Sequence, residues 1–203
     1  MIFDIFPTRV GVWHLDLGVD LDAAIANELR AVHACHRTGE QIWDRKPHDI
    51  FDGSLPACAL LVGYAREHFA EFVGERGRVA AITGREIVRE PGVEIMPHSD
   101  ADDAHVHGAY FPMGAEIDPS RPLLEQVNAF GPNGYAICGS DFRSAATEAG
   151  LLPWEEIRKY WVKPHRGLLV AFDARAVHFQ RPHAGPGQFA QALLNVRVER
   201  THG

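Results

Sequence analysis

The hydrophobic residues in the first third of the chain recur at helical spacing. Apolar side chains return every three or four positions from about 20 to 34 and again from about 55 to 73, so the pattern predicts two helices. Gly74 is suited to end the second helix. Before them, residues 1–16 are rich in β-branched and aromatic side chains and are interrupted by Pro7. That texture is typical of an edge strand.

From about Arg78 onward, short runs of β-branched and aromatic residues alternate with Gly, Pro, Asn and Asp, which is typical of a sandwich or barrel. Two helices followed by roughly eight strands predict an α+β, mainly β fold, namely a double-stranded β-helix (jelly-roll) with N-terminal supporting helices. We expect a single domain over residues 1–203, with the first strand and the helices in 1–77 and the β-helix core in 78–203. The expected strands are 79–82, 86–89, 93–97, 105–111, 135–138, 167–172, 176–180 and 189–199.

The stretch from Gly114 to Gly134 is rich in Pro, Gly and Asn and is expected to form a long loop. Loops of this length inside compact domains tend to be lids or binding elements. We therefore hypothesise that substrate specificity is set there.

Composition narrows the class of protein. With 203 residues and 46% hydrophobic content, the chain can bury one sizeable core, and its net charge of -7 argues against binding to nucleic acid. No apolar run approaches the roughly 20 residues that cross a bilayer, so we expect a cytoplasmic protein without a membrane partner. Cys35, Cys58 and Cys138 are odd in number and far apart, which indicates reduced structural thiols.

One pair of residues carries metal-binding chemistry. His98 and Asp100 are two positions apart at the end of a predicted strand, so their side chains share one face. His178 follows a second predicted strand and a turn. Two imidazoles and one carboxylate form the facial triad that suits iron(II) and leaves positions open for other ligands. A structural zinc site usually contains thiolates, and no Cys lies nearby in the sequence.

The segments around this triad carry a family resemblance. Residues 89–100 read REPGVEIMPHSD, and residues 166–182 read RGLLVAFDARAVHFQRP. They resemble the two metal-binding segments of 2-oxoglutarate/iron(II) oxygenases of the prolyl-hydroxylase-like type, although Pro182 falls one position later than in the family. The opening IFPTRVGVW also resembles small bacterial members of that superfamily.

The resemblance implies that His98, Asp100 and His178 are both the ligands of Fe(II) and the catalytic centre. It also implies that 2-oxoglutarate is decarboxylated to succinate while dioxygen is reduced. Halogenating relatives have a small residue in place of Asp100, so the carboxylate points to hydroxylation or a related oxidation of a C–H bond. The compact length favours a small-molecule substrate. The sequence leaves open whether the protein forms a homodimer.

The chain departs from the family at the co-substrate. Relatives carry a basic residue on the strand after the distal His, where it pairs with the far carboxylate of 2-oxoglutarate, but no Arg or Lys stands about ten residues past His178. Gln191, Asn195 and Arg197 share one face by strand parity, so Gln191 could bind the carboxylate and Arg197 could reach it. Further candidates are Arg181, Arg166 and Lys163.

Tyr110 matches a position where relatives often carry a Tyr that hydrogen-bonds 2-oxoglutarate, and it is equally explained as a core aromatic. His105 and His107 alternate on the same strand and face away from Tyr110. They could line the pocket, although a hydrated outer face explains them more simply.

Three alternatives remain at this stage. His105 and His107 form an H-x-H pair like that of a cupin metal enzyme, although the next Glu, Glu116, lies farther along than cupin spacing requires. The missing basic residue favours a non-catalytic jelly-roll binding module. The chain could also be an iron oxygenase that uses no keto acid.

Overall fold

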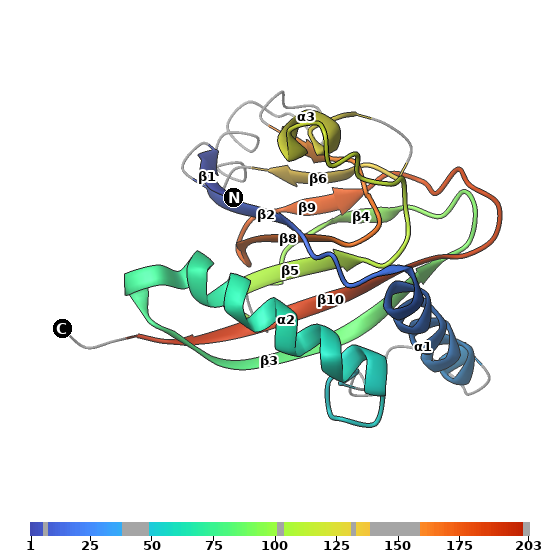
Figure 1. The fold of residues 1–203 in the computed structure, drawn as a ribbon, viewed down its shortest axis with the longest axis horizontal. Helices are drawn as coiled ribbons and strands as arrows, with labels where there is room; N and C mark the ends of the chain where they lie inside the picture. The colour runs from blue at the N-terminus through green and yellow to red at the C-terminus, as the bar shows by residue number, and fades with distance from the viewer. Residues whose placement is uncertain (6–7, 38–48, 101–103, 131–132, 139–158, 201–203) are drawn as a thin grey trace.

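The computed structural model describes residues 1–5, 8–37, 49–100, 104–130, 133–138 and 159–200. Two antiparallel sheets face each other, as the jelly-roll prediction requires (Figure 1). The larger sheet has the order β1 (Ile2–Ile5), β2 (Thr8–His14), β8 (Leu168–Asp173), β5 (Val106–Phe111), β10 (Phe189–Glu199) and β3 (Arg78–Arg89). The smaller sheet has the order β4 (Ile95–His98), β9 (His178–Gln180), β6 (Tyr135–Cys138) and β7 (Lys159–Val162).

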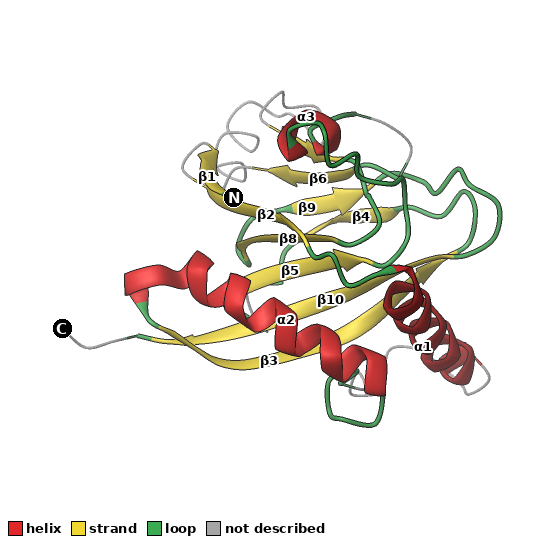
Figure 2. Ribbon diagram, viewed as in Figure 1, coloured by secondary structure: helices red, strands yellow, loops and turns green. Residues whose placement is uncertain are grey.

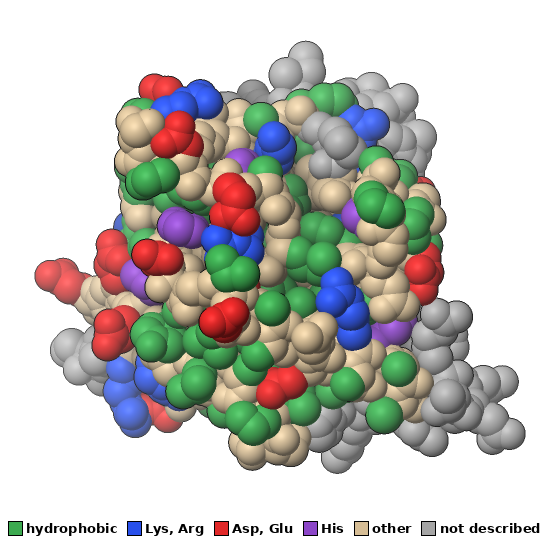
Figure 3. All heavy atoms as spheres, turned by 45° about the vertical axis from the view of Figure 1, so that its right-hand side comes forward, with side chains coloured by type: hydrophobic (Ala, Val, Ile, Leu, Met, Phe, Trp, Pro, Cys, Tyr) green, Lys and Arg blue, Asp and Glu red, His purple; other side chains and the backbone are tan. Residues whose placement is uncertain are grey.

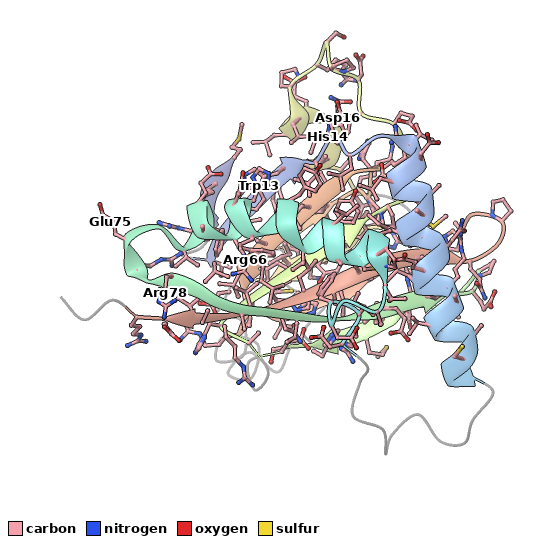
Figure 4. All side chains as sticks on the ribbon, turned by 60° about the horizontal axis from the view of Figure 1, so that its bottom comes forward. Trp13, His14, Asp16, Arg66, Glu75 and Arg78 are labelled. Atoms are coloured by element: carbon pink, nitrogen blue, oxygen red, sulfur yellow. The ribbon has the colours of Figure 1, made fainter. Side chains whose placement is uncertain are left out.

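Two long helices cover the outer face of the larger sheet, and both were predicted (Figure 2). Helix α1 spans Val19–Arg37 and α2 spans Pro56–Val73, after which the 3-10 turn η1 (Gly74–Arg76) leads into β3. Trp13 of β2 lies beside α2, where its indole Nε1 donates to Glu71 at 3.0 Å (Figure 4). The apolar stripes of both helices thereby bury one face of the sheet.

The two faces of β5 serve different layers. Val106 and Tyr110 pack with the helices, whereas Ala109 and Phe111 pack between the two sheets. His107 also points between the sheets, because its ring stacks on His178 of β9 with the centroids 4.6 Å apart. Period-two alternation along this strand therefore decides which side chains reach the space inside the barrel.

Four expectations about the elements need correction. The opening stretch forms two strands, with β1 at the sheet edge and β2 inside the sheet. Strand β3 is continuous over Arg78–Arg89, whereas two strands were expected. Glycine is needed at position 84 because a Cβ there would lie 2.3 Å from the carbonyl oxygen of Leu193 on the paired strand. The predicted loop contains a short helix, α3 (Leu123–Val127), whose Val127 is buried in the core. Strand β7 was not anticipated.

Two further observations concern partners. Among the described helices, none combines the length and hydropathy needed to cross a bilayer. On the face drawn in Figure 3, the basic side chains are interspersed with acidic ones.

Candidate metal centre

The smaller sheet brings the two predicted histidine ligands together. His98 at the end of β4 is the cross-strand partner of His178 at the start of β9, and their ring centroids lie 4.3 Å apart. Asp100 follows His98 by two residues. One ligand atom from each of the three side chains lies within 4.8 Å of the other two. The predicted triad therefore assembles from segments nearly 80 residues apart through one strand pairing.

Backbone carbonyl groups orient both rings. Nδ1 of His98 lies 2.8 Å from the carbonyl oxygen of Met96, and Nδ1 of His178 lies 3.2 Å from that of Ala176. A proton on each Nδ1 donates to these oxygens and leaves Nε2 of each ring with a lone pair. Such a contact to the second nitrogen is the usual way in which proteins set the tautomer of a metal-binding histidine.

A third imidazole supports the carboxylate. Nδ1 of His107 lies 2.9 Å from Oδ2 of Asp100, and Nε2 of His178 lies 3.3 Å from the same oxygen. His107 is completely buried. Arg85 approaches the other oxygen, Oδ1, at 3.8 Å. The Asp100 backbone N–H donates to the carbonyl of Ala174 at 3.0 Å, which fixes the turn that carries the carboxylate.

The protonation equilibria suit a cation. Burial lowers the pKa of His98 and of His178, so both rings stay neutral at neutral pH. Burial by itself raises the pKa of Asp100, but the neighbouring His107 and His178 outweigh it and the net shift is downward. The centre therefore offers two neutral nitrogen donors and one carboxylate, which is the donor set predicted for iron(II).

Of the residues predicted to contact the co-substrate, two face the space inside the barrel. Gln191 is completely buried there, and Asn195 is the cross-strand partner of His107. Arg197 is exposed near the end of β10 and is not brought to the triad. Arg181 lies over the ring of Phe130 with its Cζ 4.3 Å from the centroid.

The structure does not bring Tyr110 to the triad. Its hydroxyl donates to Asp22 of α1, on the helix side of the larger sheet, and Nη1 of Arg166 donates to the same carboxylate at 2.7 Å. Arg166 also pairs with Glu116. These contacts tie α1 to the sheet, and the strand parity that places His107 inside the barrel turns Tyr110 to the outside.

The H-x-H pair does not form a cupin centre. His105 is exposed and its Nδ1 accepts from the backbone N–H of Val198 at 2.9 Å, while Glu116 is held by Arg166. The expectation of a hydrated outer face fails for His107, which is buried beside Asp100. Every residue of β5 is buried, so strand periodicity carries no signal that separates the face of His107 from that of Tyr110.

Comparison with known proteins bears on the fold. No protein-family model matches the sequence, and no curated protein matches it. Solved structures do match. A Pseudomonas putida prolyl-4-hydroxylase is 14% identical with a TM-score of 0.61, covering 96% of this chain and 88% of its own. The chain has the fold of this hydroxylase.

Two other structures share the same jelly-roll. The non-heme alpha ketoglutarate dependent carbocyclase SnoK from nogalamycin biosynthesis is 14% identical, with a TM-score of 0.60 over 95% of this chain and 81% of that one. HygX from Streptomyces hygroscopicus, solved with nickel and 2-oxoglutarate bound, is 10% identical, with a TM-score of 0.58 over 92% of this chain and 81% of that one. The predicted fold is thereby confirmed.

Proposed function

We propose that this chain is a non-haem iron(II) dioxygenase that uses 2-oxoglutarate and dioxygen to hydroxylate or otherwise oxidise a C–H bond of a small molecule. The convergence of His98, Asp100 and His178 inside a jelly-roll carries the proposal. Structures of the same fold include hydroxylases and a protein with nickel and 2-oxoglutarate bound, and these support it.

The donor set fits iron. A facial set of two imidazoles and one carboxylate leaves positions open for a co-substrate and dioxygen. Thiolate donors, which characterise structural zinc sites, take no part in the cluster that the described residues form. Cys138 lies on the neighbouring strand β6 but packs with Val177 and Phe179, away from the triad.

Buried polar groups beside the triad suit a polar co-substrate. Both amide atoms of Gln191 and the hydroxyl of Tyr135 are buried without a hydrogen-bond partner among the described residues. The ring of Tyr135 stacks against His178, with the centroids 5.6 Å apart and an interplanar angle of 13°. Buried polar groups are costly unless they are hydrogen-bonded, so these atoms are available to a ligand such as 2-oxoglutarate.

Iron(II) in such a centre would supply the activation of dioxygen, whose four-electron reduction takes two electrons from the oxidative decarboxylation of 2-oxoglutarate to succinate and carbon dioxide and two from the substrate C–H bond. The chain's own residues hold and orient these groups. His98 and His178 present Nε2, His107 keeps the Asp100 carboxylate in place, and the aromatic rings of Tyr135 and Phe172 pack around His178 and exclude water.

The approach of substrate follows from the burial of the ligands. Asp100 and His178 are buried, whereas His98 is partly exposed and Met96, two residues earlier, is exposed. We propose that the small molecule enters beside β4 and that the 114–134 stretch, with α3, contributes to its selection. A cytoplasmic enzyme of one domain, with no nucleic acid partner, completes the proposal.

The test measures 2-oxoglutarate turnover and metal binding in the wild type and in a variant that lacks two of the three ligands. Purified protein with iron(II), ascorbate and 2-oxoglutarate should release succinate and consume dioxygen, and replacing His98 and Asp100 together by Ala should abolish both activities and tight metal binding. His105→Ala, a change at an exposed histidine, is the control and should leave them unchanged.

The outcomes separate the alternatives. Tight metal binding that survives the double replacement would refute the proposed centre. Loss of metal on replacing His107 but not His98 would indicate a cupin-type site. Dioxygen uptake with a substrate but without succinate release would indicate an iron oxygenase that uses no keto acid. Metal binding without any dioxygen uptake would indicate a non-catalytic binding module.

A further inference from the structure

Arg89 places a buried guanidinium inside the barrel. It is the last residue of β3, is only 2% exposed, and is the direct cross-strand partner of Phe189 on β10. Its Cζ lies 5.4 Å from the centroid of the Phe189 ring, which packs in the core between the two sheets. The side chain therefore projects to the same side of the larger sheet as the triad.

Only one of its three nitrogens is occupied. Nη1 donates to the carbonyl oxygens of Val93 and Arg181, at 3.1 and 2.8 Å. Nε and Nη2 are buried without a hydrogen-bond partner among the described residues, and within them Arg89 forms no ion pair. Burial lowers its pKa to about 10, so it still carries its charge at neutral pH. A buried cation left unpaired is costly, and its free nitrogens form a two-pronged site of the shape that binds a carboxylate.

The separation along β9 between His178 and the residue that binds Arg89 is close to the length of 2-oxoglutarate with its two end contacts. Arg181, whose carbonyl binds Nη1, lies three residues beyond His178, which corresponds to about 10 Å along a strand. Four C–C bonds of about 1.5 Å extend the co-substrate by about 5 Å. A metal–oxygen bond of about 2 Å at one end and a hydrogen bond of about 3 Å at the other bring the span to about 10 Å.

The polar groups described above come from the strands between Arg89 and the triad. Gln191 lies two residues beyond Phe189 on the same face of β10, and Tyr135 packs against both Phe111 and His178. Phe111 in turn packs against Phe189, with the centroids 6.4 Å apart. The buried hydrogen-bonding groups of Gln191 and Tyr135 therefore lie between Arg89 and the triad, where the middle of a bound dicarboxylate would lie.

We propose that Arg89, assisted by Gln191, binds the far carboxylate of 2-oxoglutarate, an inference that rests on the proposed function. The charge thus comes from β3, whereas the family resemblance assigns it to the strand after the distal histidine. Because β3 and β10 are paired, a guanidinium on β3 opposite Phe189 reaches the region that the missing residue on β10 would have served.

The experiment compares two keto acids on nickel(II)-loaded protein by calorimetry, without turnover. The second acid is 2-oxopentanoate, which has the same five carbons but a methyl group in place of the far carboxylate. Wild-type protein should bind 2-oxoglutarate about 10- to 100-fold more tightly, as a charge-assisted pair predicts. Arg89→Met, which keeps an unbranched side chain against Phe189, should abolish this preference while leaving the affinities for 2-oxopentanoate and nickel unchanged.

Two further variants complete the design. Arg89→Lys keeps the charge without the fork and should show a preference between those of the wild type and the Met variant. Arg78→Met makes the same change at the exposed start of β3 (Figure 4) and should behave as wild type. A wild-type preference retained by either Arg89 variant with normal nickel affinity would overturn the inference but not the function. Wild-type protein that binds nickel but neither keto acid would overturn the inference together with the use of 2-oxoglutarate.

Discussion

Replacing His107 by Phe tests how far the metal centre depends on a residue that is not itself a ligand. His107 is buried, and its Nδ1 lies 2.9 Å from Oδ2 of Asp100. Phe keeps a ring of similar size in contact with His178 and Phe172, whose ring centroids lie 4.6 and 5.1 Å away. The change therefore removes the nitrogen atoms and preserves the packing.

The expected magnitude follows from this one contact. A hydrogen bond to a charged group contributes about 1.5–3 kcal/mol. Partners of metal ligands typically contribute about 10- to 100-fold in metal affinity, which corresponds to about 1.4–2.7 kcal/mol. The two estimates agree, so we expect the dissociation constant for nickel(II) to rise by about 10- to 100-fold in His107→Phe.

The assay is calorimetric titration of metal-free protein with nickel(II), with the thermal midpoint as a check that the variant folds. His105→Phe, the same change at the exposed histidine two residues earlier, should bind nickel as the wild type does. His98→Ala sets the scale for loss of a true ligand. An affinity of His107→Phe within about threefold of wild type would refute the supporting role, and a loss as large as that of His98→Ala would make His107 a ligand.

Three other predictions concern acid stability, thiol reactivity and the buried network. Burial lowers the pKa of His178, so as pH falls below 6.5 this residue takes up a proton in the unfolded chain before it does in the folded one. The free energy of unfolding of the metal-free protein should therefore decrease by up to about 1.4 kcal/mol per pH unit for this group. The thermal midpoint of His178→Phe should fall less steeply with decreasing pH than that of the wild type. Burial raises the pKa of Cys58 far above its usual value, so iodoacetamide at pH 8 should label the exposed Cys35 and spare Cys58 until the protein is unfolded; early labelling of Cys58 would contradict its placement. Asp22→Ala leaves the buried Tyr110 hydroxyl without its acceptor, while Arg166 keeps Glu116, and should cost about 1–3 kcal/mol in urea unfolding, against less than about 0.5 kcal/mol for the exposed Asp20→Ala.

Much of the fold was predictable because the patterns are local. The helical spacing of the first third identified both long helices, and the bounds of β6 and β10 agree with the expected 135–138 and 189–199. The gap between the expected strands 79–82 and 86–89 contains Gly84, and a glycine inside a strand usually suggests an interruption. Here the glycine permits close approach of the Leu193 backbone, which depends on a partner strand more than 100 residues away.

The candidate site was predictable where it rests on strand periodicity and motif. His98 and Asp100 share a face by their spacing, and the resemblance supplied His178. The co-substrate residues were harder to predict, because parity says which residues share a face and not which face points into the barrel. That is why Tyr110, expected beside the co-substrate, lies against α1, while His107 lies beside Asp100.

The sequence by itself predicted the supporting helices, the β-rich remainder and the His98–Asp100 pair, because each depends on spacing within a few residues, and the family resemblance added His178. The tertiary structure decided what surrounds those donors. Pairing of β4 with β9 set His98 against His178, and pairing of β3 with β10 brought Arg89 inside the barrel. Such pairings join segments distant in the sequence, so they are settled by how the apolar faces of both sheets and both helices are buried together.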